Sequence, residues 1–224
     1  MKSAFLRGMA DSLSIAVGYV PVAISFGLAA VHADIAPFMA VLTSVLVYAG
    51  ASQFILVSLV ASGAGAVSVV GIVLLMNLRH LFYGPALMTR LKGERRLPLI
   101  AMAAGLTDEV FATSISKLEQ QPQQEREAWY VGLQLGAYLS WVGGTAVGAY
   151  FGHDWIRNSA ILSQTLGFVL PALFFALLLE IKQLVPLRVL GVAAAATLLG
   201  LCLLPAYAAI VLGMLAGALL AGRS

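Results

Sequence analysis

Long apolar runs separated by short polar connections make up most of this chain. An α-helix needs about 20 apolar residues to cross roughly 30 Å of hydrocarbon, and these runs have about that length. A transmembrane β-barrel would instead show segments of about ten residues with alternating polarity, whereas these runs are continuously apolar. The sequence therefore predicts an all-α, polytopic membrane helix bundle, folded as one integral membrane domain over residues 1–224.

The apolar pattern predicts about seven or eight membrane segments. They cover residues 12–33, 38–62, 67–89, 98–117, 128–151, 164–181, 187–204 and 205–222. Only Leu204 and Pro205 separate the last two, so these form either a tight helical hairpin or one long kinked helix. Aromatic residues at both ends of the fifth segment are expected to anchor it in the headgroup zone: Trp129, Tyr130, Tyr150, Phe151 and Trp155.

The composition excludes several other classes of protein. Only 10% of the residues are charged, against about 25% in a soluble domain, so the surrounding medium is expected to be a lipid bilayer. The net charge of +3 is spread over loops, which argues against a nucleic-acid partner. The single cysteine, Cys202, lies in an apolar run and allows no intramolecular disulfide.

The N-terminus resembles a secretory signal peptide, because Lys2 and Arg7 precede an apolar stretch. That stretch is longer than the usual 7 to 15 residues and contains Pro21 well inside it. We therefore expect a retained first helix.

Two proline-containing stretches resemble each other: "VGYVPVAISFG" at 17–27 and "LGFVLPALFFA" at 166–176. A proline inside a helix removes a backbone hydrogen bond and obstructs the preceding turn, so both helices are predicted to be interrupted or kinked. Paired interrupted helices in two halves of a chain are typical of transporter binding sites. The alternative is coincidence, since glycine and proline are common in membrane helices; the internal repeat is a hypothesis.

The orientation of the chain stays open. With the N-terminus in the cytoplasm and eight spans, the cluster Arg90, Lys92, Arg95 and Arg96 falls outside, against the positive-inside rule. Treating segments 12–33 and 164–181 as re-entrant hairpins brings that cluster inside. An inverted repeat, however, would put those two segments on opposite sides.

Three pairs of glycines spaced four residues apart allow close approach of helix backbones. We interpret them as packing surfaces for helices of the same chain or, in a higher oligomer, for a second copy: Gly132 and Gly136, Gly144 and Gly148, Gly213 and Gly217.

Polar residues inside two of the segments require an explanation. The stretch "MNLRHLFYG" places Asn77, Arg79 and His80 in the bilayer, and "AAGLTDEVFATS" places Asp108 and Glu109 at comparable depth. An arginine at the centre of a membrane helix costs roughly 2.5–3.5 kcal/mol, so it needs a partner. Adjacent helical residues point about 100° apart, so the two acids cannot face Arg79 equally. We predict that one acid pairs with Arg79 and the other faces a transport pathway; the alternative is an ion pair that only locks the bundle.

Further polar groups lie on segment 38–62. Ser44, Tyr48 and Ser52 form a stripe at four-residue spacing with Gln53 beside it, and they bind either neighbouring helices or a passing zwitterion. His80 is a proton carrier only if it lines the same cavity as the acids; otherwise it bonds a neighbouring carbonyl.

An enzyme is not expected. No HExxH motif occurs, the histidines are isolated, and two adjacent acids on one helix do not converge as a catalytic pair would. No cofactor or metal site is predicted.

The chain resembles the AzlC family, the large subunits of branched-chain amino-acid exporters. The resemblance rests on "GYVPVAISFGLAA" at 18–30, "YAGASQF" at 48–54, "NLRHLFYG" at 77–84 and "LTDEVFA" at 106–112. It implies export of leucine, isoleucine, valine and sometimes methionine across the bacterial inner (cytoplasmic) membrane, together with a small AzlD-type membrane subunit. The motif residues are Pro21, Phe26, Gly27, Tyr48, Gly50, Gln53, Asn77, Arg79, His80, Asp108 and Glu109. The candidate substrate-binding residues are the same set with Ser52 in place of Gly50.

The expected mechanism follows from the shape of such a substrate. Its carboxylate is expected to meet Arg79 or backbone amides at a break near Pro21, and its ammonium to meet Asp108 or Glu109. Protonation of an acid would couple export by alternating access to the proton gradient. The alternatives are a channel or exporter for another small solute, and a membrane scaffold that transports nothing.

Overall fold

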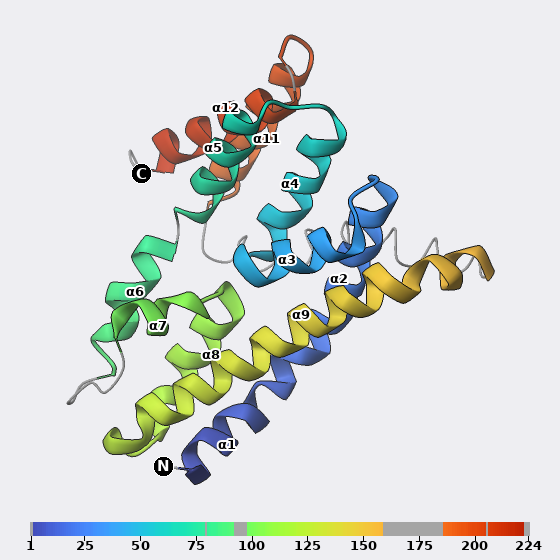
Figure 1. Ribbon diagram of the computed structural model, residues 1–224. Coiled ribbons are helices and arrows are strands. Elements are labelled where there is room, and N and C mark those ends of the chain that lie inside the picture. Colours follow the sequence, from blue (N-terminus) through green and yellow to red (C-terminus); the bar gives the residue numbers. More distant parts are fainter. Residues whose placement is uncertain (1, 79, 92–97, 159–185, 205, 222–224) are drawn as a thin grey trace. The chain divides into compact units, whose positions relative to one another are not determined.

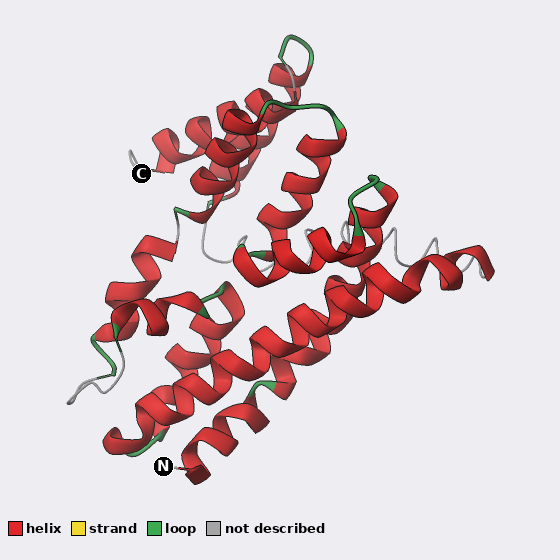
Figure 2. Cartoon of the chain, in the orientation of Figure 1, coloured by secondary structure: helices red, strands yellow, loops and turns green. Residues whose placement is uncertain are grey.

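The computed structural model describes residues 2–78, 80–91, 98–158, 186–204 and 206–221. Every regular element among these residues is a helix, which confirms the all-α class (Figure 2). The chain divides into two compact units, Met1–Val169 and Leu170–Ser224. Segment 164–181, including Pro171 and the second copy of the predicted repeat, lies outside the described residues, so the repeat and the number of membrane segments stay predictions.

Three helices of the first unit pack together: α1 (Lys2–Asp11), α2 (Leu13–His32) and α9 (Arg126–Asn158). α1 and α2 pack along α9 (Figure 1). Glycines permit this approach: a Cβ on Gly132 would overlap the carbonyl of Phe5, and one on Gly148 would overlap the carbonyl of Ile24. The glycine pairs of α9 are therefore occupied by helices of the same chain and are not a free surface for a second copy.

α2 does not break at Pro21. The helix is continuous from Leu13 to His32, and Pro21 lies on its exposed face. Of the two predicted forms, the interruption is wrong at this position, and the kink stays a prediction. A membrane helix tolerates proline where packing and nearby hydroxyls compensate for the lost hydrogen bond. Here the buried face of α2 packs along α9, and this packing supports a continuous helix through the proline.

The interruptions lie in three other segments. Segment 38–62 consists of α3 (Pro37–Leu46) and α4 (Gly50–Ala61). Segment 67–89 consists of α5 (Ala66–Asn77) and α6 (His80–Met88), and segment 98–117 of α7 (Leu99–Ala104) and α8 (Asp108–Lys117). In the part of the chain that the structure describes, only α2 is by itself both long and apolar enough to cross a bilayer.

Two short 3₁₀ helices, η1 (Leu118–Gln120) and η2 (Gln123–Glu125), connect α8 to α9. Trp129 and Tyr130 at the start of α9 are fully buried rather than at a membrane surface, whereas Tyr150 and Phe151 near its other end are exposed. The anchoring prediction is therefore wrong for the first two residues, because their polar atoms bond inside the protein: the indole of Trp129 to Asp11 and the hydroxyl of Tyr130 to the Met102 carbonyl.

The second unit is described only by α11 (Leu187–Leu201) and α12 (Ala206–Ala221). These helices pack antiparallel, because Gly200 lies against Ala209 while Gly217 lies against Ala193. Of the two arrangements that the sequence allowed for this region, the helical hairpin is correct.

Asp11 joins three elements at the start of the first unit. Its carboxylate accepts a hydrogen bond from the indole of Trp129 at 2.8 Å and forms an ion pair with Lys117. Burial acts to raise the pKa of the Asp11 carboxyl, but the bonds from Lys117 and Trp129 and the charges of Lys117 and Arg7 outweigh it, so the pKa lies below its usual value.

We expect Asp11→Asn to lower the free energy of unfolding by about 1 kcal/mol at pH 7, the value of a partly exposed ion pair with one further bond. A lowered pKa stabilises the fold above the unfolded value of about 3.9, and this contribution is lost as the pH falls through the lower folded value. Thermal unfolding in detergent at pH 7 and at pH 3 measures it. If the difference between wild type and Asp11→Asn is as large at pH 3 as at pH 7, the ion-pair explanation fails.

Candidate functional site

The break between α3 and α4 places Tyr48 in an unusual conformation. Its φ of 41° lies in the left-handed region, which is uncommon for a bulky residue and costs of order 1–3 kcal/mol. The ring packs edge-on against Tyr138 of α9, with centroids 4.9 Å apart. Only 6% of the residue is exposed, and its hydroxyl has no hydrogen-bond partner among the described residues. Strained residues with unsatisfied polar atoms are found preferentially at functional sites.

The break between α7 and α8 carries Glu109. Thr107 caps α8, because its hydroxyl oxygen accepts a bond from the amide of Val110. The hydroxyl of Tyr19 on α2 lies 2.6 Å from Thr107 Oγ1 and donates to Glu109 Oε2 at 2.6 Å. Glu109 is half-buried, and no lysine or arginine among the described residues pairs with it.

Asp108 points to a different neighbour. The hydroxyl of Tyr83 on α6 donates to Asp108 Oδ1 at 2.7 Å, and the Tyr83 ring stacks on Phe111 at 4.4 Å. Neighbouring residues at the start of α8 diverge by about 100°, so Asp108 faces α6 while Glu109 faces α2. The structure thus separates the two acids that the sequence could not tell apart.

Gln53 fixes the start of α4 against α9. Its Oε1 accepts bonds from the Ala49 amide at 3.1 Å and from the Trp141 indole at 3.0 Å, and its Nε2 donates to Ser44 at 2.9 Å. Ser44 also bonds Thr145 at 2.8 Å. The polar atoms of this network are therefore used to join helices, which favours the packing interpretation for Ser44 and Gln53.

Asn77 and His80 flank the break between α5 and α6. The amide of Asn77 donates to Ser52 at 3.2 Å, which ties α5 to α4. His80 Nδ1 lies 3.1 Å from the Asn77 carbonyl, and its ring stands edge-on to Tyr83. Bonding to a nearby carbonyl is the second of the two roles that the sequence allowed for His80.

Three candidate residues lie apart from this cluster, and a fourth is not placed. Pro21 is on the exposed face of α2, Phe26 packs against Phe54 with ring centroids 5.4 Å apart, and Gly27 lies against the backbone of α9. Arg79 lies outside the described residues, so its pairing with either acid stays a prediction.

Sequence reasoning missed Tyr19, Thr107 and Trp141. Tyr19 stands inside the motif "GYVPVAISFG", where the proline gave the stronger signal. Threonine directly before "DEV" is a typical helix N-cap and would have indicated that a helix begins at Asp108. Trp141 gave no signal, because its neighbours on the sequence are those of an ordinary apolar helix.

Glu109 and the aromatic residues around it have the chemistry that binding of a primary ammonium group requires. A carboxylate at a partly buried position attracts a cation more strongly than in water. Tyrosine and tryptophan rings offer an apolar surface that also attracts cations, and Tyr19 stands edge-on to Trp141 with centroids 5.2 Å apart.

Residues 14–155 match the family described as AzlC protein. The chain is 36% identical to the inner membrane protein YgaZ of Escherichia coli (strain K12) over 218 residues, 97% of this chain and 89% of that protein. It is 40% identical to an uncharacterized membrane protein of Archaeoglobus fulgidus over 78% of this chain and 74% of that protein.

A more distant relative carries a functional name. The branched-chain amino acid transport protein AzlC of Bacillus subtilis (strain 168) is 26% identical over 80% of this chain and 68% of that protein. No solved structure matches the chain. The family match covers most of the chain, including the three interrupted segments, and it confirms the resemblance inferred from the motifs: this is a membrane protein that belongs to the AzlC family.

Proposed function

We propose that this protein exports branched-chain amino acids across the bacterial inner membrane by alternating access, as a multi-pass subunit that works with a small AzlD-type membrane protein. The observation that carries the proposal is Glu109, a half-buried carboxylate at a helix break, held by the Tyr19 hydroxyl. An acid kept at such a position costs free energy and is retained where it binds a ligand. The name of the Bacillus subtilis relative supports the substrate class.

The parts of the substrate match groups of different chemistry. The ammonium binds the Glu109 carboxylate. The substrate carboxylate needs donors, which Arg79 and the amides of Gly50, Ala51 and Ser52 at the start of α4 supply, since the first amides of a helix have no acceptor within it. The aliphatic tail packs on the rings of Tyr138 and Trp141, which lie beside Tyr48 and Tyr19.

Counterflow of labelled leucine tests the function directly. We expect proteoliposomes that hold this protein and its small partner to accumulate label against unlabelled internal leucine, and liposomes with the chain alone to do so at least about tenfold more slowly. Counterflow requires a carrier that exposes its site alternately to each side. Flux that rises without limit and shows no exchange would instead identify a channel, and exchange only with an unrelated solute would overturn the substrate class.

Proton coupling gives a separate prediction. If Glu109 alternates between proton and substrate ammonium, then an uncoupler added at a constant leucine gradient slows export several-fold. The measurement uses preloaded vesicles, with and without an imposed pH gradient. Export at the same rate in both conditions would show a uniporter.

A further inference from the structure

The contacts of each element with α9 show where that element lies along the long axis of the first unit. α1 and α2 run parallel to α9: Gly8 lies against Trp129, and farther along, Ile24 lies against Gly148 and Leu28 against Gly152. We call the end at Trp129 the basic end and the end at Gly152 the far end. The 33 residues of α9 span about 50 Å at 1.5 Å per residue, so the middle of the helix, near Trp141, lies about half-way through.

α3 enters from the far end and stops in the middle. It begins at Pro37, directly after α2 has ended at His32. Its last turn is at the middle of α9, because the Val45 carbonyl accepts a bond from the Tyr138 hydroxyl at 3.0 Å. Ten residues rise only about 15 Å, half of the hydrocarbon thickness.

α4 returns toward the end from which α3 came. It begins at Gly50, which lies against the Trp141 ring. One turn later Phe54 contacts Phe26, and the residues on either side of Phe26 lie against the far part of α9. Both outer ends of the α3–α4 hairpin therefore lie at the far end, with its tip at Val47–Ala49.

The α7–α8 hairpin has the opposite placement. Gly105, just after α7, lies against Gln134, and Thr107 and Glu109 meet Tyr19 at the middle. α8 then leads back to the basic end, where Lys117 pairs with Asp11. Its ten residues also rise only about 15 Å.

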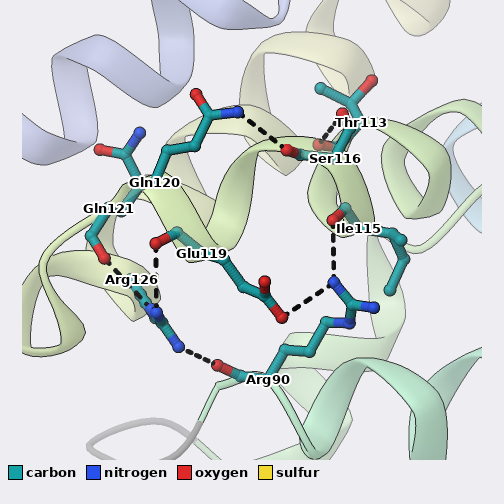
Figure 3. A network of polar contacts seen from close by, with 8 residues as sticks. All are labelled: Arg90, Thr113, Ile115, Ser116, Glu119, Gln120, Gln121 and Arg126. Carbon is teal, nitrogen blue, oxygen red and sulfur yellow. Dashed lines mark hydrogen bonds and ion pairs between the residues drawn. The ribbon is translucent and has the colours of Figure 1, made fainter.

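The end of α6, which precedes α7 in the chain, also lies at the basic end. The Arg90 guanidinium donates to the Ile115 carbonyl at 3.1 Å and pairs with the Glu119 carboxylate at 3.0 Å. Figure 3 shows both contacts. Arg126 donates to the Arg90 carbonyl at 2.6 Å. The end of α6, the end of α8 and the start of α9 are therefore together at the basic end.

We propose that α3–α4 and α7–α8 are re-entrant hairpins that enter the membrane from opposite faces, and that their tips meet at Tyr19 to form the ammonium-binding centre of the transport path, with Tyr48 from one tip and Glu109 from the other. The part of this proposal that concerns the ligand rests on the proposed function, whereas the topology does not.

Two observations connect the tips. Tyr19 bonds Glu109 and stands edge-on to Trp141, and the Trp141 indole in turn bonds Gln53 in the first turn of α4. The buried hydroxyl of Tyr48 interacts with the Tyr19 hydroxyl and with the Glu109 carboxylate, yet it makes no hydrogen bond of standard geometry among the described residues. A hydroxyl that is buried, unsatisfied and held by a strained backbone is available to a ligand that enters between the tips.

This topology places the basic residues on one side of the membrane, as the positive-inside rule expects, whereas eight straight spans divide them between both sides. Four described cations of the first unit lie at the basic end, which the positive-inside rule therefore assigns to the cytoplasm: Arg7, Arg90, Lys117 and Arg126. It also differs from the sequence interpretation in which segment 12–33 re-enters, because the re-entrant elements are 37–61 and 99–117.

Labelling of single cysteines tests the topology without reference to transport. In a Cys202→Ser background, cysteines are placed at four exposed positions and treated with a membrane-impermeant maleimide in intact cells, then after permeabilisation. We expect Ala36→Cys and Ser62→Cys to label in intact cells, and Thr89→Cys and Gln120→Cys to label only after permeabilisation. With eight straight spans, the cysteine at position 62 would label only after permeabilisation and the cysteine at position 89 would label in intact cells. Either of these results overturns the hairpin topology.

Tyr48→Phe tests the ligand role of the tip. It removes only the hydroxyl and keeps the ring on Tyr138, so we expect leucine counterflow to fall about tenfold while the unfolding midpoint does not fall. Tyr150→Phe is the matched control, because it removes the hydroxyl of an exposed tyrosine on α9, away from the tip. Full counterflow in Tyr48→Phe overturns the binding role of this hydroxyl. Since wild-type counterflow is measured alongside, that result is distinct from failure of the proposed function.

Discussion

Glu109→Gln is expected to lower leucine counterflow by about tenfold to a hundredfold, a larger functional loss than we expect from any other single substitution. Glutamine keeps the size of the side chain and can still accept from Tyr19, but it carries no charge for the substrate ammonium. Hydrogen bonds to charged groups contribute about 1.5–3 kcal/mol, and about 1.4 kcal/mol corresponds to a factor of ten. Initial rates over a range of leucine concentrations show whether the loss is in affinity.

Two control variants sharpen this experiment. Glu119→Gln removes an acid of the same type at the surface, where its side chain is 64% exposed and pairs with Arg90; we expect wild-type counterflow. Asp108→Asn changes the adjacent acid, which faces Tyr83 rather than Tyr19, so its loss of affinity is expected to be smaller than that of Glu109→Gln. Equal affinities in Glu109→Gln and wild type, with the protein correctly inserted, would remove Glu109 from the site.

Gly27→Ala is expected to have the largest effect on stability. A Cβ at Gly27 would overlap the carbonyl of Thr145 and lie 2.6 Å from the amide nitrogen of Ala149. Both are backbone atoms of α9, so no side-chain rotation relieves the contact and the two helices must move apart. Overpacking of this kind costs about 1–3 kcal/mol and occasionally more. Thermal unfolding and size-exclusion behaviour in detergent measure the loss.

Gly18→Ala in the same helix is the matched control. Nothing lies within 4 Å of a Cβ at that position. Alanine is the better helix former by roughly 1 kcal/mol, so this variant should unfold at the same temperature as wild type or higher. If Gly27→Ala unfolds like Gly18→Ala but fails to bind leucine, then Gly27 serves the substrate rather than the packing.

The sequence alone predicted the helical class and the family. Continuous apolar runs indicate membrane helices because backbone groups in hydrocarbon must bond within their own segment. The hydropathy pattern also placed both ends of α2 and the start of α9 within a few residues of where they lie. In addition, the sequence singled out Tyr48, Asp108 and Glu109, since polar or charged groups inside apolar runs need a reason to be there.

Only the tertiary structure decided where the helices break and which neighbours the polar residues have. Hydropathy does not distinguish a helix that crosses the bilayer from a hairpin that enters and returns, because both keep apolar side chains toward lipid and neighbouring helices. Pro21 remains helical since α9 supports α2, while the chain turns at Tyr48 and Thr107. At these turns Gln53 accepts a bond from the Ala49 amide, and the Thr107 hydroxyl accepts one from the Val110 amide. Asp108 and Glu109 are adjacent in the chain, yet contacts with α6 and α2 give them different partners. Such contacts join residues that are 25 and 90 positions apart, and no local pattern encodes them.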